Sequence, residues 1–179
     1  DDQRIVGSAL PDFNASFINT LTFYNNFSFG FQFDWRKGNQ IYNLTRQWLY
    51  RDRLSKDFDQ PITINGQTGA YVQYYNSLYN NVSPISWFVE DGSFLRLRDI
   101  SLSYQLHDKY KPKWLRSAGI TLAGRNIFTR TNYSGLDPES TNTSDAQGNA
   151  APSIGAINGV DYFGVSNLKS YQLILSFGF

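Results

Sequence analysis

Phe27-Ser28-Phe29-Gly30-Phe31-Gln32-Phe33-Asp34-Trp35 alternates between an aromatic side chain and a small or polar one. Because successive side chains of a β-strand point to opposite faces, this segment predicts a strand with one aromatic and one wet face. Strands of a soluble sandwich also alternate, but they usually present Val, Ile and Leu to a packed core. An unbroken row of large aromatic side chains on one face is more typical of a strand that meets lipid. The segment therefore favours a membrane-spanning strand.

Four other segments alternate in the same way. They are residues 13–24, 94–106, 119–130 and 168–179, the last of which ends on Phe179. A change of phase near Asp99 predicts a β-bulge, or a strand that rises above the membrane before it enters it. Asn25-Asn26 predicts a tight hairpin turn, because asparagine tolerates positive φ. The sequence thus predicts five antiparallel strands.

The connections between these strands are alternately short and long. The short ones are Asn25-Asn26 and His107–Ser117, and the long ones are about 36–91 and 131–167. Bacterial outer-membrane barrels alternate short periplasmic turns with long outer loops. The pattern predicts an all-β fold, an antiparallel segment of a transmembrane β-barrel with a periplasmic C-terminus. Five strands cannot close a barrel, because two unpaired edges would remain in lipid.

Composition narrows the class of protein. Aromatic residues make up 17% of the chain, yet the mean hydropathy is −0.42, and no apolar run is long enough for a transmembrane helix. A formal net charge of +1 predicts no nucleic-acid partner. The chain has no cysteine and one histidine, His107, so no thiolate or Ser/His/Asp chemistry is expected and the protein is predicted not to be an enzyme. Asp137, Glu139 and Asp145 lack the ligand spacing of a calcium loop, so no metal or other cofactor is expected.

The alternation of side chains indicates which residues are expected to face the membrane. They are Phe27, Phe29, Phe31, Phe33, Trp35, Ile100, Leu102, Tyr104, Tyr171, Leu173, Leu175 and Phe177. Aromatic residues of the first long loop could stack on a transported substrate, pack the loop, or contact a lid protein. The candidates for substrate contact are Trp48, Tyr74, Tyr75 and Trp87. In the same loop, the spacing of Leu44 and Trp48 indicates a short helix.

Four stretches resemble the C-terminal β-barrel region of the SusC/RagA family of TonB-linked outer-membrane transporters. Gly124-Arg125-Asn126-Ile127-Phe128-Thr129 is similar to a family strand that reads glycine, any residue, asparagine, leucine or isoleucine, phenylalanine, threonine. The other stretches are Gly92–Tyr104, Tyr133–Glu139 and Leu173–Phe179. All four agree with the family in order and spacing. Leu168-Lys169 departs from it, because a Pro-Arg pair often precedes the last family strand.

This resemblance implies a TonB-dependent transporter of about 22 strands that imports an oligosaccharide or a peptide. Residues 1–179 would be the C-terminal part of the barrel, with the plug domain and the N-terminal strands absent. The implied partners are the rest of the barrel and its plug, TonB through that absent part, a SusD-like surface lipoprotein, and outer-membrane lipid. Phe179 resembles the sorting signal read by the barrel-assembly machinery. Whether the chain is a fragment or a separate subunit stays open.

A soluble β-sandwich that binds glycans through exposed aromatic residues is the alternative from another class. It predicts that Phe27, Phe29, Phe31 and Phe33 pack a core and that the protein dissolves without detergent.

Overall fold

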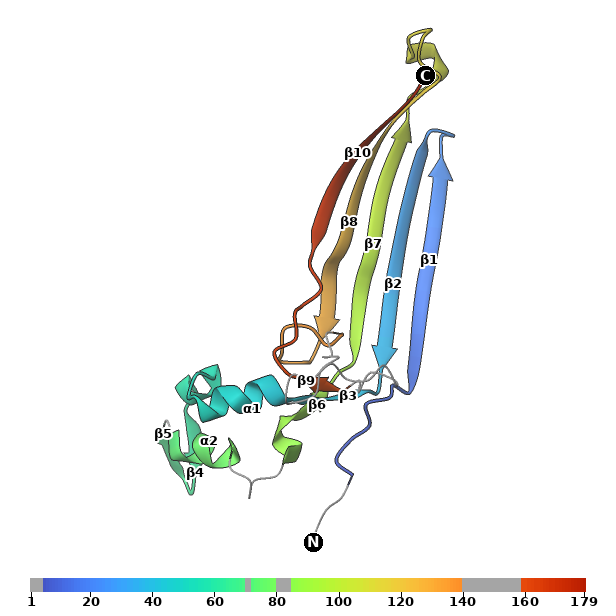
Figure 1. Cartoon of the computed structure of the whole chain (residues 1–179). Helices are drawn as coiled ribbons and strands as arrows, with labels where there is room; N and C mark the ends of the chain where they lie inside the picture. Colours follow the sequence, from blue (N-terminus) through green and yellow to red (C-terminus); the bar gives the residue numbers. More distant parts are fainter. Residues whose placement is uncertain (1–4, 70–71, 80–84, 140–158) are drawn as a thin grey trace. The chain divides into compact units, whose positions relative to one another are not determined.

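The computed structural model describes residues 5–69, 72–79, 85–139 and 159–179 (Figure 1). The chain divides into two compact units. The first, called the sheet unit, comprises Phe13–Lys37, Phe94–Thr131 and Asn167–Phe179. The second, called the loop unit, comprises the described parts of Asp1–Asp12, Gly38–Ser93 and Asn132–Ser166.

The sheet unit is an antiparallel sheet of five strands in the order β1-β2-β7-β8-β10 (Figure 1). Their bounds are β1 Phe13–Phe23, β2 Phe27–Lys37, β7 Phe94–Gln105, β8 Ser117–Thr131 and β10 Ser170–Gly178. Each of the five segments that alternation predicted forms one of these strands. The prediction of an antiparallel β-structure is therefore confirmed.

The turn between β1 and β2 lies one residue earlier than predicted. Positive φ occurs at Tyr24 (52°) and Asn25 (55°), and not at Asn26. Asn26 instead bonds to the neighbouring strand β7, where its Nδ2 donates to the carbonyl of Gln105 at 2.8 Å and its own carbonyl accepts from the Gln105 N–H. This amide therefore fixes the end of the hairpin against β7. The other short connection, between β7 and β8, contains the 3₁₀ turn η3 (Asp108–Tyr110).

The predicted β-bulge is confirmed and lies at Arg98. Gln32 pairs with Asp99 and Phe33 pairs with Leu97, so Arg98 is an extra residue on β7. The β7–β8 register shifts at the same place. Because one residue is added, Leu97 and Ile100 come to the same face of the sheet. The bulge therefore keeps the apolar side chains of β7 on one face, although their phase changes along the sequence.

The loop unit is far more ordered than the sequence predicted. Its short strand β3 (Gln40–Asn43) pairs antiparallel with β6 (Val89–Asp91) and parallel with β9 (Val160–Asp161). The predicted short helix is α1 (Leu44–Arg51), capped by Asn43, whose side chain accepts from the Arg46 N–H at 2.8 Å. The remaining elements are η1 Lys56–Asp59, β4 Ile62–Ile64, β5 Gln67–Gly69, α2 Val72–Tyr79 and η2 Ile85–Phe88. None of the helices in the described ranges is long and apolar enough to span a membrane.

Aromatic rings form the core of the loop unit. Tyr50 and Phe88 are fully buried and Tyr75 is 5% exposed. Tyr50 meets Phe88 and Tyr75 edge to face, with centroid distances of 5.1 and 5.8 Å. Tyr75 was a candidate for substrate contact, but its burial makes it a packing residue of this core.

Phe88→Ala is expected to destabilise the loop unit by about 3–5 kcal/mol, because it removes a fully buried ring. Limited proteolysis of the full-length protein, with cleavage sites mapped by mass spectrometry, should show faster cutting within residues 38–93. The matched control is Val165→Ala, which shortens a side chain of the same unit that is largely exposed. Equal cutting rates in the two variants would contradict an aromatic core.

Candidate functional site

The register of the sheet unit collects apolar side chains on one face. Phe29 pairs with Leu102, which pairs with Leu122, which in turn pairs with Leu173. All the residues expected to face the membrane share this face, which we call the apolar face: Phe27, Phe29, Phe31, Phe33, Trp35, Ile100, Leu102, Tyr104, Tyr171, Leu173, Leu175 and Phe177. That they share a face is confirmed, and their contact with lipid stays a prediction.

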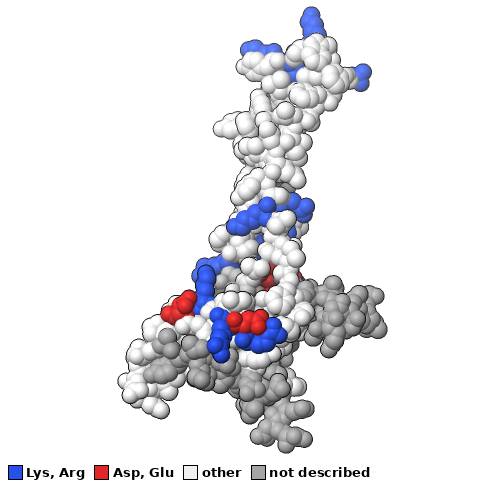
Figure 2. Space-filling model, turned by 60° about the vertical axis from the view of Figure 1, so that its left-hand side comes forward, with Lys and Arg blue, Asp and Glu red and all other residues white. Residues whose placement is uncertain are grey.

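Charged side chains lie on the opposite face, which we call the polar face. Arg98 Nε is 2.6 Å from Asp34 Oδ2, and Arg125 Nε is 2.9 Å from Asp99 Oδ1. On the strands, only Lys37 and Arg130 take charge to the apolar face, each at or near the end of its strand. Figure 2 shows Lys and Arg side chains gathered at the end of the sheet where the β7–β8 connection lies, followed by a stretch without charge. The sheet therefore has one apolar and one polar face, and its charged side chains are also distributed unevenly along the strands.

An aromatic pair closes that end of the sheet. The ring of Phe179 stacks on Trp114, with centroids 5.8 Å apart and planes 13° from parallel. Both rings are otherwise largely exposed. Nothing in the alternation pattern indicated Trp114, because it lies in the connection between β7 and β8. The role of Phe179 as a sorting signal stays a prediction.

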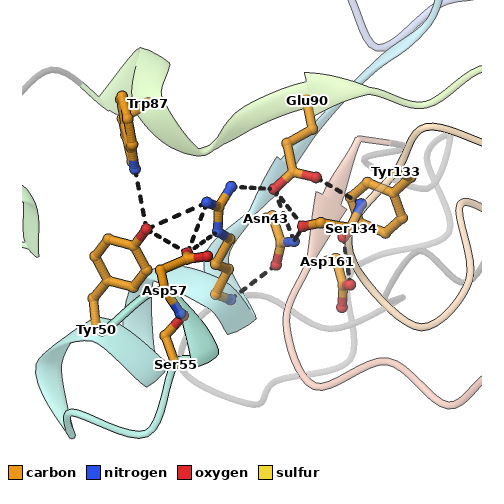
Figure 3. A network of polar contacts seen from close by, with 10 residues as sticks. Asn43, Tyr50, Ser55, Asp57, Trp87, Glu90, Tyr133, Ser134 and Asp161 are labelled. Atoms are coloured by element: carbon orange, nitrogen blue, oxygen red, sulfur yellow. Dashed lines mark hydrogen bonds and ion pairs between the residues drawn. The ribbon is translucent and has the colours of Figure 1, made fainter. Parts of the chain in front are cut away.

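A polar network crosses the loop unit (Figure 3). Arg46 donates to Asp57 Oδ2 from Nη2 at 2.8 Å and from Nε at 3.1 Å, and to Glu90 Oε1 from Nη1 at 3.0 Å. The Tyr50 hydroxyl donates to the same Asp57 oxygen at 2.5 Å and accepts from Trp87 Nε1 at 3.3 Å. The guanidinium thus links α1 to η1 and β6.

Glu90 extends this network to the segment that follows β8. Its carboxylate accepts from the Asn43 amide at 3.2 Å and from the N–H and hydroxyl of Ser134, each at 2.8 Å. With the bond from Arg46, this one side chain accepts four hydrogen bonds. It therefore joins the two long connections of the chain into a single unit.

Asp161 is a second buried anchor. Only 4% exposed, it accepts from the Tyr133 hydroxyl at 2.5 Å and from the Thr45 hydroxyl and the Gly164 N–H at 3.2 Å each. The Thr45 hydroxyl also accepts from the Phe163 N–H at 2.6 Å. Phe163 has φ of 52°, a left-handed conformation that is an outlier for a bulky residue. The surrounding hydrogen bonds hold it there.

The charges of the network perturb its titrating groups. Burial acts to raise the pKa of the Asp57 carboxyl, but the hydrogen bonds from Tyr50 and Arg46 outweigh it, so the pKa lies below 3.8. Burial, together with the bond to Asp57, raises the pKa of Tyr50 to about 12. Burial and the bond to Asp161 raise the pKa of Tyr133. At neutral pH the carboxylate is therefore charged and both phenols are neutral.

A cleft of about 640 Å³ opens beside this network. Its lining includes polar groups of Asn43, Thr45 and Asp161, and the apolar side chains of Leu54, Leu136 and Phe163, much of each of which is exposed. Its full lining is Asn43, Thr45, Arg46, Leu49, Leu54, Ser55, Lys56, Asp57, Ser134, Gly135, Leu136, Asp161, Phe163 and Gly164. The sequence indicated none of these as a site, because distant segments contribute them.

The aromatic candidates for substrate contact do not line this cleft. Trp48 has the Arg51 guanidinium 3.8 Å above its ring centroid and meets the edge of Tyr162. Tyr74 and Trp87 are partly exposed, and Tyr75 is buried in the core. None of these four candidates lines the cleft. Their contact with substrate stays a prediction for the exposed ones.

The residues considered for metal binding form no such site in the described ranges. No group of three or more His, Asp or Glu that could hold an ion occurs there. Asp137 is buried and accepts from the Glu139 N–H at 2.9 Å, so it orders its own loop. Asp145 lies outside the described residues. His107 is exposed in the β7–β8 connection, where its Nδ1 accepts from the Lys109 N–H.

Acid is expected to loosen the loop unit through Asp57. Because its pKa is lowered on folding, its stabilising contribution is present above the unfolded value and is lost as the pH falls through the folded value, below 3.8. The protection of residues 44–58 against hydrogen exchange, relative to the intrinsic exchange rate at each pH, should therefore fall below about pH 4. Asp57→Asn should exchange faster at pH 7 and lose part of this pH dependence. The exposed Asp59→Asn is the control, and a wild-type pH profile in Asp57→Asn would contradict the assignment.

No protein-family model matches the chain. Its curated relatives include three proteins of Formosa agariphila. TonB-dependent receptor P26 is 32% identical over 147 residues, which are 79% of this chain and 15% of the relative. TonB-dependent receptor P3 is 27% identical over 179 residues, 99% of this chain and 17% of the relative. TonB-dependent receptor P39 is 32% identical over 158 residues, which are 82% of this chain and 15% of the relative. The chain therefore spans only about one sixth of these relatives.

Solved structures share the fold. The RagAB peptide importer in its "open-open" state superposes on 98% of this chain with a TM-score of 0.63 and 21% identity, and 18% of that structure's chain is covered. The importer in its "closed-closed" state superposes on 97% of this chain with a TM-score of 0.64 and 19% identity, and 18% of that structure's chain is covered. Together with the receptors, these structures confirm the resemblance that the four sequence stretches carried. The chain belongs to the SusC/RagA family of TonB-dependent outer-membrane receptors.

Proposed function

We propose that this chain forms part of the wall and outer loops of a TonB-dependent transporter that imports an oligosaccharide or a peptide across the outer membrane. The observation that carries the proposal is the two-faced sheet. Its apolar face joins aromatic and aliphatic side chains across five strands, while the ion pairs Asp34–Arg98 and Asp99–Arg125 lie on the other face. A barrel wall needs this division, with lipid outside and a polar interior.

The dimensions of the strands support a membrane span. The eleven residues of β2 rise about 36 Å at about 3.3 Å per residue. A tilt of about 40° would reduce this to a height of about 28 Å, close to the apolar band of about 25 Å on outer-membrane barrels. The strands are therefore long enough to cross the hydrocarbon layer when tilted.

The edges of the sheet require further strands. Among the described residues, β1 pairs only with β2, and β10 pairs only with β8. Unpaired N–H and C=O groups at a sheet edge are too costly to leave in lipid. In the proposed transporter, strands of the remaining barrel pair with both edges, and the plug and the TonB contact belong to that remainder.

Connectivity supports an orientation. The segments that build the loop unit all leave the sheet at the same strand ends, after Lys37, before Phe94, after Thr131 and before Ser170. Outer-membrane barrels place their long connections outside the cell. The loop unit is then extracellular, the β1–β2 turn and Phe179 are periplasmic, and a SusD-like lipoprotein is the proposed partner of the loop unit.

The alternative, a glycan-binding sandwich, is less well supported. It needs a second layer to cover the apolar face, whereas Phe17, Leu122 and Leu173 are each more than half exposed. The four aromatic candidates for sugar stacking do not support it either, because Tyr75 is buried and none of the four lines the cleft.

Adjacent residues of β1 provide a matched test of the membrane face. Phe17 and Ile18 are both apolar and are 58% and 67% exposed, but Phe17 lies on the apolar face and Ile18 on the polar face. Phe17→Arg should reduce the folded, heat-modifiable protein in the outer membrane, because a cation in lipid costs about 2–4 kcal/mol. Ile18→Arg should leave that amount close to the wild-type level.

Equal effects of the two substitutions would contradict a lipid-facing side. Transport is tested in cells that carry or lack the full-length protein, by the uptake of labelled oligopeptides and oligosaccharides with and without a proton-motive force. Uptake that needs both the protein and the proton-motive force supports the proposal. Recovery of the protein in detergent-free buffer would overturn it.

A further inference from the structure

The polar groups beside the cleft are already satisfied. Arg46 is bonded to Asp57 and Glu90, and Asp161 accepts from Tyr133, Thr45 and Gly164. Figure 3 shows Asp57 pointing toward Tyr50, and Glu90 pointing toward Asn43 and Ser134. A sugar needs free donors and acceptors for its hydroxyl groups, and a network saturated in this way offers few.

Three apolar side chains of the cleft lining are exposed to solvent. Leu54, Leu136 and Phe163 are 70%, 80% and 55% exposed and line the same cavity. The backbone of Phe163 is left-handed, and the turn is fixed because the N–H groups of Phe163 and Gly164 donate to the Thr45 hydroxyl and the Asp161 carboxylate. Strain of this kind tends to persist where a site is preorganised. The cleft therefore offers a fixed apolar surface to a bound group.

One charged group of the lining is unpaired. The Lys56 ammonium is exposed and has no hydrogen-bond or ion-pair partner within the described ranges, whereas Arg46, Asp57 and Asp161 all have partners. A ligand that fits the cleft thus combines an apolar body with one negative charge. The cleft volume of about 640 Å³ is also within the usual range of ligand sites, about 300–1,000 Å³.

We propose that this cleft binds the C-terminal residue of a short peptide, with its apolar side chain against Leu136 and Phe163 and its carboxylate paired with Lys56. The inference rests on the proposed import function and narrows its cargo from oligosaccharide or peptide to peptide. The peptide importers that share the fold are too distant in sequence to carry it. The inference rests instead on the saturated polar network, the exposed apolar side chains and the unpaired Lys56 ammonium of the cleft.

Isothermal titration of the full-length protein, purified in a detergent without a sugar headgroup, tests the site directly. The probes are alanyl-alanyl-leucine, its C-terminal amide, and a linear tetrasaccharide. The free acid should bind about fivefold more tightly than the amide, as expected for one solvent-exposed ion pair. Lys56→Gln should remove this difference, whereas Lys113→Gln, a control in the sheet unit, should preserve it.

A second variant tests the apolar contact without disturbing the fold. Leu136→Ser changes a largely exposed side chain and should weaken the free acid and the amide equally, by about fivefold. Binding of both peptides that is indifferent to Lys56 and Leu136 would overturn the cleft as their site. Binding of the tetrasaccharide alone would overturn the peptide assignment. Because titration needs no transport, either result leaves the import function to be judged by the uptake assay.

Discussion

Strand register is the constraint on which the rest of the structure depends. Side chains alternate across a strand, so a slip of one residue would move the whole apolar set of that strand to the other face. The bulge at Arg98 matters for this reason, because it returns Ile100, Leu102 and Tyr104 to the face that already holds Leu95 and Leu97. The same bulge lets Arg98 reach Asp34, so the correction of phase and the charge pairing occur at one place.

The loop unit is stabilised by a different kind of interaction. Its segments are short, and strands of two to four residues give little stability by themselves. Hydrogen-bonded carboxylates join them instead. Glu90 connects α1 to Ser134, and Asp161 connects β9 to Tyr133 and Thr45. In such a network each group is costly to leave unpaired, so the two long connections hold or loosen together.

The sequence predicted the features that depend on the alternation of apolar and polar side chains along a strand. Alternation located the five strands, and the change of phase located the bulge. It placed the hairpin turn one residue late, because Tyr24 adopts a conformation that favours asparagine or glycine. It left loop packing open as one role of the aromatic residues in the first long loop, but it did not group Tyr50, Tyr75 and Phe88 into a core, because their spacing follows no helical or strand period. It also missed the cleft, because the residues that line it, such as Leu54 and Phe163, come from segments far apart in the sequence.

The most direct test of the central claim is a spin-label scan along β7 in lipid bilayers. The chain has no cysteine. Single cysteines can therefore be placed at successive positions from Ile100 to Tyr104 in a full-length protein that contains no other cysteine. Labels at Ile100, Leu102 and Tyr104 should be accessible to oxygen, which dissolves in lipid. Labels at Ser101 and Ser103 should instead be accessible to a water-soluble nickel complex. Accessibility that does not alternate with a period of two residues would contradict a lipid-facing apolar side.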